Sequence, residues 1–235
     1  MTDKHLSSQF DADLARLSTR LLAMGGMVEQ QVTRAVVLLE RFVPREFAAI
    51  VEDEKHVNLA ERELDEALGQ VIARRQPAAR DLRLLMASSK CTSNLERAAD
   101  EAHKVAKCAK RIDEQVEPQA FDFAEVLRAG QLASDILNRA LDAFARMDTK
   151  AAIQVMEDDF AIDEEFRAFA TRMVPYMSEH PRMISVALDY MFVAKGIERI
   201  GDHATNIAEF VVYVVGGTDI RHATANVLNR CARYG

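Results

Sequence analysis

A Glu-Arg-x-x-Asp segment occurs twice in this chain, beginning at Glu96 and at Glu198, and it marks an internal duplication. Three features recur in the same order in the two halves: Asp53 with Asp158, Pro77 with Pro181, and Glu96 with Glu198. The offset between the halves changes only from 105 residues at the first match to 102 at the last, which is typical of a duplicated unit with small insertions. The sequence therefore predicts two copies of one supersecondary unit.

Each half is expected to form three long helices. Nine glycines and five prolines in 235 residues leave few interruptions, and four of the prolines stand where a helix can begin. Helices are expected over residues 7–40, 45–75, 78–113, 119–147, 150–178 and 182–215, with a kink or an early end at Pro175. The predicted fold class is all-α, with two tandem, pseudo-symmetric three-helix bundles. These bundles would span residues 1–115 and 116–217, followed by a tail at 218–235.

Charge and cysteine usage exclude several classes of protein. The net charge of −7 is unfavourable for a surface that binds nucleic acid or anionic lipid. Cys91, Cys108 and Cys231 form no CxxC pair, which suits reduced thiols. The first residues lack the layout of a signal peptide, and no apolar run reaches the roughly 18 residues of a membrane span. We therefore expect a soluble cytoplasmic protein that reaches a membrane only through partners.

Acidic residues lie within the apolar stripe of four expected helices, by the count of about 100° per residue. These residues and their polar neighbours are Glu54, Asn58, Glu61, Asp65, Glu96, Asp100, Asp159, Asp163, Glu198, Asp202 and Asn206. Antiparallel packing could bring the two groups of each half to the same level. Carboxylates that share a site raise one another's pKa, so a bound cation is expected. Oxygen ligands favour Mg²⁺, Mn²⁺, Ca²⁺ or iron, and His56, His103 or His203 could add nitrogen ligands.

Basic side chains offer another way to neutralise these acids, through ion pairs within or between helices. The residues placed to do so are Arg97, Lys104, Lys195 and Arg199. A second basic group is either a solvated helix end or a docking surface, and it consists of Arg74, Arg75, Arg80 and Arg83. Motifs of zinc proteases and serine hydrolases are missing from the sequence, so no catalytic residue is expected.

The two Glu-Arg-x-x-Asp helices resemble those of the PhoU family of phosphate-system regulators. The turn Gln76-Pro77-Ala78-Ala79-Arg80-Asp81-Leu82-Arg83 is similar to the signature that leads into the third helix of that family. The segment Ile-Glu-Arg-Ile-Gly-Asp-His-Ala-Thr-Asn-Ile-Ala-Glu over residues 197–209, which follows His180-Pro181-Arg182, is similar almost residue for residue. The resemblance covers about residues 7–215.

The resemblance implies two three-helix bundles related by pseudo-twofold symmetry, often in a homodimer. It also implies paired E/D-x-x-x-D motifs that bind metal ions in some members, such as iron, manganese, magnesium or zinc. The implied ligands are Glu54, Asn58, Glu96 and Asp100 in the first half, and Asp159, Asp163, Glu198, Asp202 and Asn206 in the second. The first half departs from the pattern at Asn58, where an acid is usual, and at Ala98-Ala99, which stand in place of Ile200-Gly201.

The resemblance implies a function as well. Members of the family repress the phosphate-starvation response by linking the ATPase of the phosphate ABC transporter to a sensor histidine kinase when phosphate is plentiful. We therefore expect a metal-binding adaptor that is not an enzyme and has no nucleic-acid partner. Two alternatives remain open: a transport accessory that restrains phosphate uptake without controlling the kinase, and a metal-dependent phosphoesterase.

Overall fold

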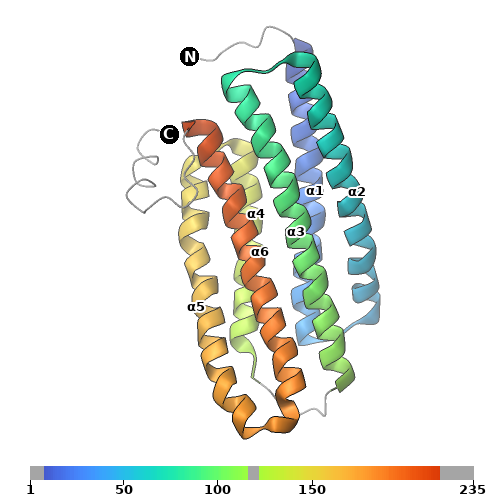
Figure 1. The fold of residues 1–235 in the computed structure, drawn as a ribbon, viewed down its shortest axis with the longest axis vertical. Helices are drawn as coiled ribbons and strands as arrows, with labels where there is room; N and C mark the ends of the chain where they lie inside the picture. The colour runs from blue at the N-terminus through green and yellow to red at the C-terminus, as the bar shows by residue number, and fades with distance from the viewer. Residues whose placement is uncertain (1–7, 116–121, 218–235) are drawn as a thin grey trace.

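The computed structural model describes residues 8–115 and 122–217, and the regular elements within these ranges are all helical (Figure 1). The long helices are α1 (Ser8–Glu40), α2 (Pro44–Arg75), α3 (Ala79–Gln115), α4 (Ala124–Arg146), α5 (Thr149–Glu179) and α6 (Ile184–Gly216). A short 3₁₀ helix, η1 (Pro181–Met183), leads into α6. The prediction of an all-α chain with six long helices is confirmed. The expected tail at 218–235 and Cys231 lie outside the described residues. The predicted start of the fourth helix at 119 is too early, because residues 122 and 123 are not helical and Phe123 is the N-cap residue of α4.

Local chemistry sets the ends of several helices. Pro44 occupies the first turn of α2, where its missing N–H costs no hydrogen bond. Asp148 caps α5, because its side chain accepts hydrogen bonds from the backbone nitrogens of Lys150 and Ala151 at 3.0 and 3.1 Å. An early end at Pro175 is wrong, since α5 continues to Glu179. Pro175 is exposed and lies one turn before the helix end, where the loss of one backbone hydrogen bond is tolerated.

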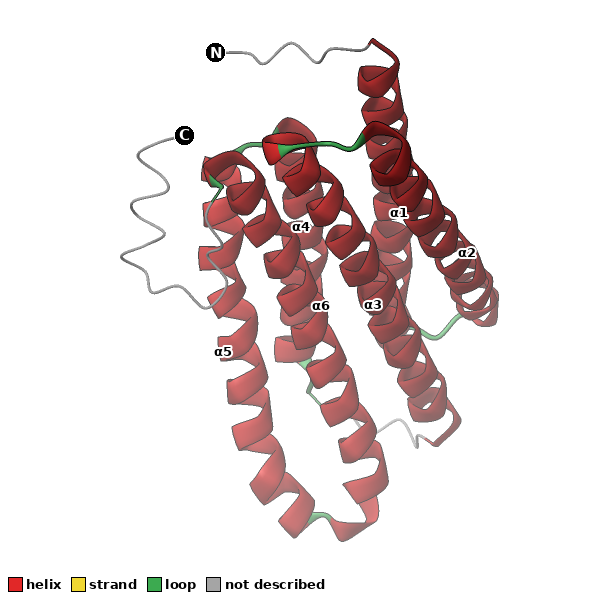
Figure 2. Ribbon diagram, turned by 45° about the horizontal axis from the view of Figure 1, so that its top comes forward, coloured by secondary structure: helices red, strands yellow, loops and turns green. Residues whose placement is uncertain are grey.

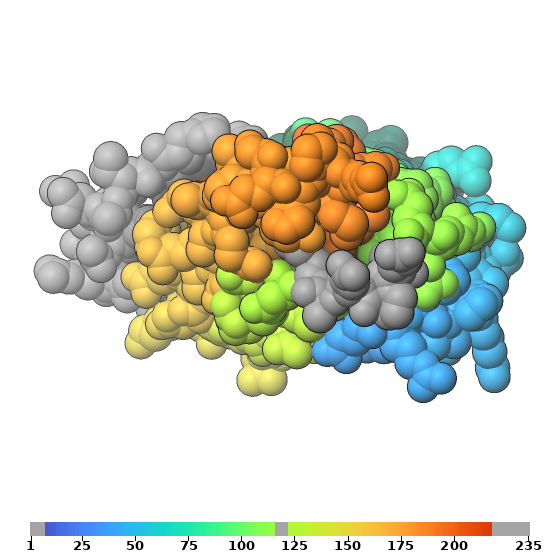
Figure 3. All heavy atoms as spheres, turned by 90° about the horizontal axis from the view of Figure 1, so that it is seen from below, coloured from blue at the N-terminus to red at the C-terminus, as the bar shows by residue number. Residues whose placement is uncertain are grey.

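The helices form two layers. Contacts between neighbours place α2, α3, α6 and α5 side by side in that order, while α1 packs on α2 and α3, and α4 packs on α5 and α6. Figures 1 and 2 show this arrangement, with all six helices running along the long axis. The view along that axis shows the blue and cyan residues of the first repeat on one side, and the yellow and orange residues of the second repeat towards the other (Figure 3). The two repeats meet mainly through α3 and α6, with α1 against α4 behind them.

One continuous hydrophobic core passes through both repeats. It includes Met24 of α1, Leu95 of α3, Leu137 of α4 and Ile197 of α6, each of them fully or almost fully buried. Such packing favours long helices whose apolar faces share several partners. None of the described helices is long and apolar enough to cross a bilayer.

Close contact between α1 and α4 depends on small residues. A Cβ atom on Gly130 of α4 would lie 2.8 Å from Cγ2 of Val36 on α1. Such a distance requires one of the helices to shift, because β-branched valine has little rotamer freedom in a helix. By contrast, a Cβ atom on Gly69 of α2 would meet no atom within 4 Å.

We therefore predict opposite effects for two glycine-to-alanine substitutions. Gly69→Ala should raise the free energy of unfolding by about 0.5–1 kcal/mol, because alanine loses less backbone entropy in a helix. Gly130→Ala should lower it by about 1–3 kcal/mol through overpacking against Val36. Urea denaturation of both variants measures the difference. A gain in stability for both would contradict the close packing of α1 on α4.

Candidate functional site

The second repeat brings its predicted acids together where α5 packs against α6. Burial, together with the nearby carboxylates of Asp202, Asp163 and Glu198, raises the pKa of Asp159 to about 6. Burial also raises the pKa of Asp202, with Glu198 as the next cause. These four side chains therefore feel one another's charge, as the antiparallel pairing of the helices predicts.

A glycine on α6 makes room for this cluster. A Cβ atom on Gly201 would lie 2.5 Å from Oδ1 of Asp159 and 3.0 Å from Cδ1 of Ile162. Any larger residue would therefore push the Asp159 carboxylate away from α6. The hydroxyl group of Thr205, one turn further along α6, lowers the pKa of Asp159 and partly offsets the effect of burial.

The side chain of Glu198 is only 13% exposed, compared with 43% for that of Asp163. Its Oε1 accepts a hydrogen bond from Nζ of Lys195 at 2.5 Å. Its Oε2 is buried and has no hydrogen-bond partner among the described residues. A buried carboxylate oxygen without a partner is costly, so its position suits a cation.

The count along the apolar stripes suggests that the acids lie in the interior of the bundle. The structure shows that they do not. Asp202 is exposed, and the side chain of Asp163 is 43% exposed. The helical count locates the right side of each helix but not the depth, and these residues lie at the edge of the buried stripe. The cluster is therefore an acidic surface that faces solvent along the contact of α5 with α6, and we call it the acidic groove of the second repeat.

The remaining predicted ligand of the second repeat, Asn206, also contacts the first repeat. Its Nδ2 donates a hydrogen bond to Oδ1 of Asn94 on α3 at 3.0 Å, and Nδ1 of His203 lies 3.0 Å from the same oxygen. Only Oδ1 of Asn206 is then available as a metal ligand. Burial, followed by the charge of Arg97, lowers the pKa of His203 to about 4, so its imidazole is neutral at pH 7.

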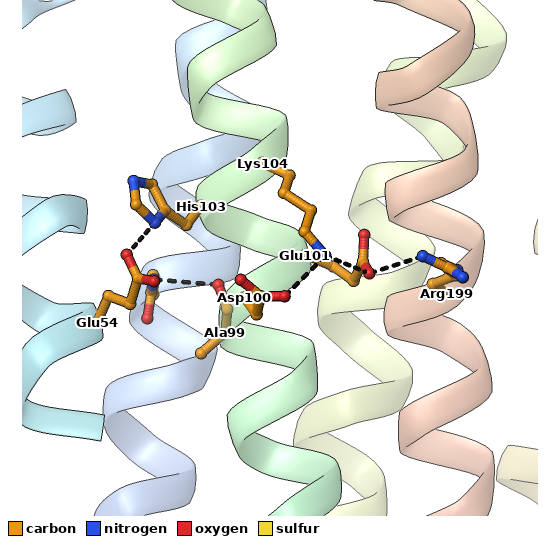
Figure 4. Close-up of polar contacts among 8 residues, drawn as sticks. Glu54, Ala99, Asp100, Glu101, His103, Lys104 and Arg199 are labelled. Atoms are coloured by element: carbon orange, nitrogen blue, oxygen red, sulfur yellow. Dashed lines mark hydrogen bonds and ion pairs between the residues drawn. The ribbon is translucent and has the colours of Figure 1, made fainter. Parts of the chain in front are cut away.

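In the first repeat, the predicted acids come from α2 and α3, and Figure 4 shows two of them, Glu54 and Asp100. Glu54 of α2 contacts Nδ1 of His103, a buried residue of α3. Asp100 forms an ion pair with Lys104 at 2.7 Å. Burial raises the pKa of Glu96, with a smaller effect of Asp100.

Two further residues complete this cluster. Burial raises the pKa of Glu61, and the neighbouring Glu96 and Asp65 raise it further. Asn58 is half-buried on α2, one turn from both Glu54 and Glu61. The first repeat thus has an acidic groove that corresponds to that of the second. Two predicted acids have a basic partner in each repeat: Glu54 and Asp100 in the first, and Asp163 and Glu198 in the second.

The alternative interpretation, that basic residues neutralise the acids, is right in part. Lys104 pairs with Asp100, and Lys195 pairs with Glu198. Arg199, however, pairs with no acid of the motif in its own repeat. Its Nη1 donates to Oε1 of Glu101, across the interface between the repeats, at 3.0 Å (Figure 4).

Glu101 was missed by the sequence reasoning. It is a buried residue of α3, and its Oε1 accepts hydrogen bonds from both Lys104 and Arg199. The sequence does contain a sign of this role, because Glu101 stands among small residues of α3 such as Ala99 and Ala102. Small residues mark a closely packed helix face, and an acid on such a face needs a partner on the neighbouring helix.

The chemistry of the second cluster fits a metal ion. Within residues 8–115 and 122–217, no three carboxylate, imidazole or thiol groups converge closely enough to hold one in this structure. The oxygen-only donor set, the buried Oε2 of Glu198 and the raised pKa of Asp159 are nevertheless features that a hard cation would compensate. The fit is weaker in the first repeat, where the neutral Asn58 takes the place of Asp163.

Comparison with known proteins covers both repeats. The model of the family described as PhoU domain matches residues 21–109 and 126–211. A Burkholderia sp. protein named phosphate-specific transport system accessory protein PhoU homolog is 46% identical over 97% of this chain and 97% of its own length. The Escherichia coli (strain K12) protein of that name, without the word homolog, is 38% identical over 97% of this chain and 94% of its own length. A crystal structure of PhoU from Pseudomonas aeruginosa, 42% identical, superposes with a TM-score of 0.85 over 89% of this chain and 100% of its own.

The raised pKa of Asp159 predicts a pH dependence of stability. In the unfolded chain this carboxyl group ionises near its ordinary value of 3.8, whereas in the folded protein it ionises at about 6. The folded state therefore holds this proton more tightly, and its contribution to stability is lost as the pH rises from about 4 to 6. We expect Asp159→Asn to flatten the curve in this window and to be more stable than the parent protein at pH 7.

This prediction concerns the metal-free protein, so the measurement is urea denaturation at pH 4–7 in the presence of a chelator. The control is Asp113→Asn, at an exposed position on α3 outside the acidic grooves. It should leave the shape of the curve unchanged. Parallel curves for Asp159→Asn and the parent protein would rule out the effect of Asp159.

Proposed function

This chain belongs to the PhoU family, and from this membership we propose that it is a phosphate-transport accessory protein that represses the phosphate-starvation response. In this proposal it is a cytoplasmic homodimer that binds the ATPase of a phosphate ABC transporter and a sensor histidine kinase. It keeps the kinase in its inhibitory state when phosphate is plentiful, and it carries out no catalytic step. The names of the relatives from Burkholderia and Escherichia coli support the connection with phosphate transport.

Metal ions are the second part of the proposal. Asp159, Asp163, Glu198, Asp202 and Oδ1 of Asn206 would hold them in the second repeat, and Glu54, Asn58, Glu96 and Asp100 in the first. A bound metal ion supplies positive charge that offsets the repulsion between carboxylates and joins the two helices of a groove. Iron, manganese, magnesium and zinc are all candidates, because carboxylate sites select by geometry and availability more than by affinity. The observation that carries this part is the buried, unpartnered Oε2 of Glu198 beside the raised pKa of Asp159.

An adaptor of this kind acts by differential affinity. A partner that prefers one state of the kinase shifts its population toward that state, by no more than the difference in binding free energy. The two acidic grooves flank the α3–α6 pair within one layer of helices, so a large partner can reach both of them. Metal ions in the grooves would fix the helix spacing and the charge of that surface.

The test of the regulatory role is alkaline phosphatase activity in phosphate-replete cells that lack this protein, measured beside the parent strain and a complemented strain. Loss of a repressor should raise the activity, and complementation should lower it again. Activity as low as in the parent strain would contradict control of the kinase. It would favour the second candidate, a transport accessory that restrains phosphate uptake, which the relatives' names also fit. Phosphate uptake rates in the same strains would then decide.

The metal-binding part predicts a linked loss of metal and stability. Glu198→Ala combined with Asp202→Ala should lower the metal content of the protein and abolish the stabilisation that metal provides. A ligand at a hundred times its Kd stabilises the folded state by about 2.7 kcal/mol, so the melting temperature should depend on the metal only in the parent protein. Elemental analysis and thermal melting with and without a chelator measure both effects.

The matched control removes two acids from the same region that do not belong to the cluster. Glu157 and Glu164 of α5 are exposed, and Glu157→Ala with Glu164→Ala changes the net charge by the same amount. This variant should keep the metal and its stabilisation. The metal-binding part fails if the chelator leaves the melting temperature of the parent protein and of both variants unchanged.

A further inference from the structure

A pocket of about 280 Å³ lies between α3 and α6, where the two repeats meet. The charged residues that line it are Glu101, Lys104, Lys107, Arg111, Lys195 and Arg199. Five of these six carry positive charge, although the chain as a whole has a net charge of −7. The pocket is therefore a local concentration of positive charge in an acidic protein, and it suits an anionic ligand.

Two acidic residues, Glu101 and Asp189, form ion pairs with cations that line the pocket. Glu101 accepts hydrogen bonds from Lys104 at 3.1 Å and from Arg199 at 3.0 Å, as Figure 4 shows between α3 and α6. Asp189, a buried residue of α6, accepts from Nε and Nη2 of Arg111 at 2.8 and 2.5 Å. The side chains of Lys104, Arg111 and Arg199 remain 51%, 46% and 53% exposed. Their other N–H groups can therefore reach a ligand while these ion pairs persist.

One wall of the pocket is aromatic. Phe192 of α6 lines the pocket and is 62% exposed. An exposed aromatic ring beside cations offers a stacking surface for a planar, electron-rich group. Gly196, one turn further along α6, also lines the pocket, and a Cβ atom there would lie 3.0 Å from Cγ2 of Val105 on α3. This contact fixes how closely the two helices approach.

We propose that this pocket binds an oligophosphate anion of the nucleoside triphosphate class. Its phosphate groups contact the cations of α3 and α6, and its base stacks on Phe192. Arginine presents paired N–H groups that match phosphate oxygens, and lysine adds point charge. Because these cations are spread over two helices, they match an anion with several phosphate groups better than an anion with a single phosphate group. Because α3 and α6 belong to different repeats, the bound anion joins the two repeats, and it does so without a metal ion.

The test is isothermal titration of the full-length, chelator-treated protein with ATP, with tripolyphosphate and with orthophosphate. We expect saturable binding of one ATP or tripolyphosphate per chain, weaker at higher salt, and weaker binding of orthophosphate. Lys107→Glu should weaken the binding of both ATP and tripolyphosphate about tenfold or more, since a charge-assisted hydrogen bond is lost and a charge repulsion is added. Lys107 is exposed, so this change should leave thermal melting unaffected.

Two further variants make the result specific. Lys90→Glu makes the same charge change at an exposed position of α3 outside the pocket, and it should alter the Kd less than twofold. Phe192→Ala should weaken the binding of ATP about tenfold and leave the binding of tripolyphosphate unchanged, because only ATP carries a base that can stack on the ring. The pocket assignment is overturned if neither oligophosphate saturates at millimolar concentration, or if Lys90→Glu is as harmful as Lys107→Glu. Equal affinity for ATP before and after Phe192→Ala would overturn the nucleoside part.

Discussion

The packing of α3 against α6 is the contact on which the rest of the structure depends. It joins two three-helix repeats into one core, and at its centre it buries a carboxylate, Glu101, that must be paired. Arg199 from the other repeat and Lys104 from the same helix supply that pairing. If both partners are removed, the buried carboxylate of Glu101 is left without a compensating charge, although solvent screens the half-exposed side chains of Arg199 and Lys104. The interface is therefore specified by charge as well as by apolar area.

Acidic and basic side chains are also separated from each other across the layer of helices. The layer formed by α2, α3, α6 and α5 has three grooves, of which the outer two are acidic and the central one is lined by cations. Lys104 and Lys195 lie at the boundaries, since Lys104 pairs with Asp100 of one outer groove and Lys195 with Glu198 of the other. The three grooves are thus electrostatically linked, and a change of charge in one of them alters the partners available to the next.

The sequence allowed the helices and the acidic second cluster to be predicted, because both follow from local rules. Proline placement and helical periodicity locate the helix ends to within a few residues, and an i, i+4 spacing places Glu198 and Asp202 on one face. Depth and neighbours do not follow from these rules. The exposure of Asp202, the contact of Asn206 with Asn94 and the role of Glu101 depend on which helix packs against which, and at what height. Pro175 does not end α5 for a related reason, since an exposed helix end tolerates what an interior turn does not.

The ion pair between Arg199 and Glu101 has no mirror image across the pseudo-twofold relation. At the matching offset of 102 residues, Arg97 of α3 takes the place of Arg199, and His203 of α6 takes the place of Glu101. His203 is neutral at pH 7, since burial and the charge of Arg97 lower its pKa to about 4. One half of the interface is held by opposite charges and the other by a neutral ring beside a cation. The duplicated scaffold therefore has a polarity, and a partner that lies across both repeats meets unequal binding energies in its two possible orientations.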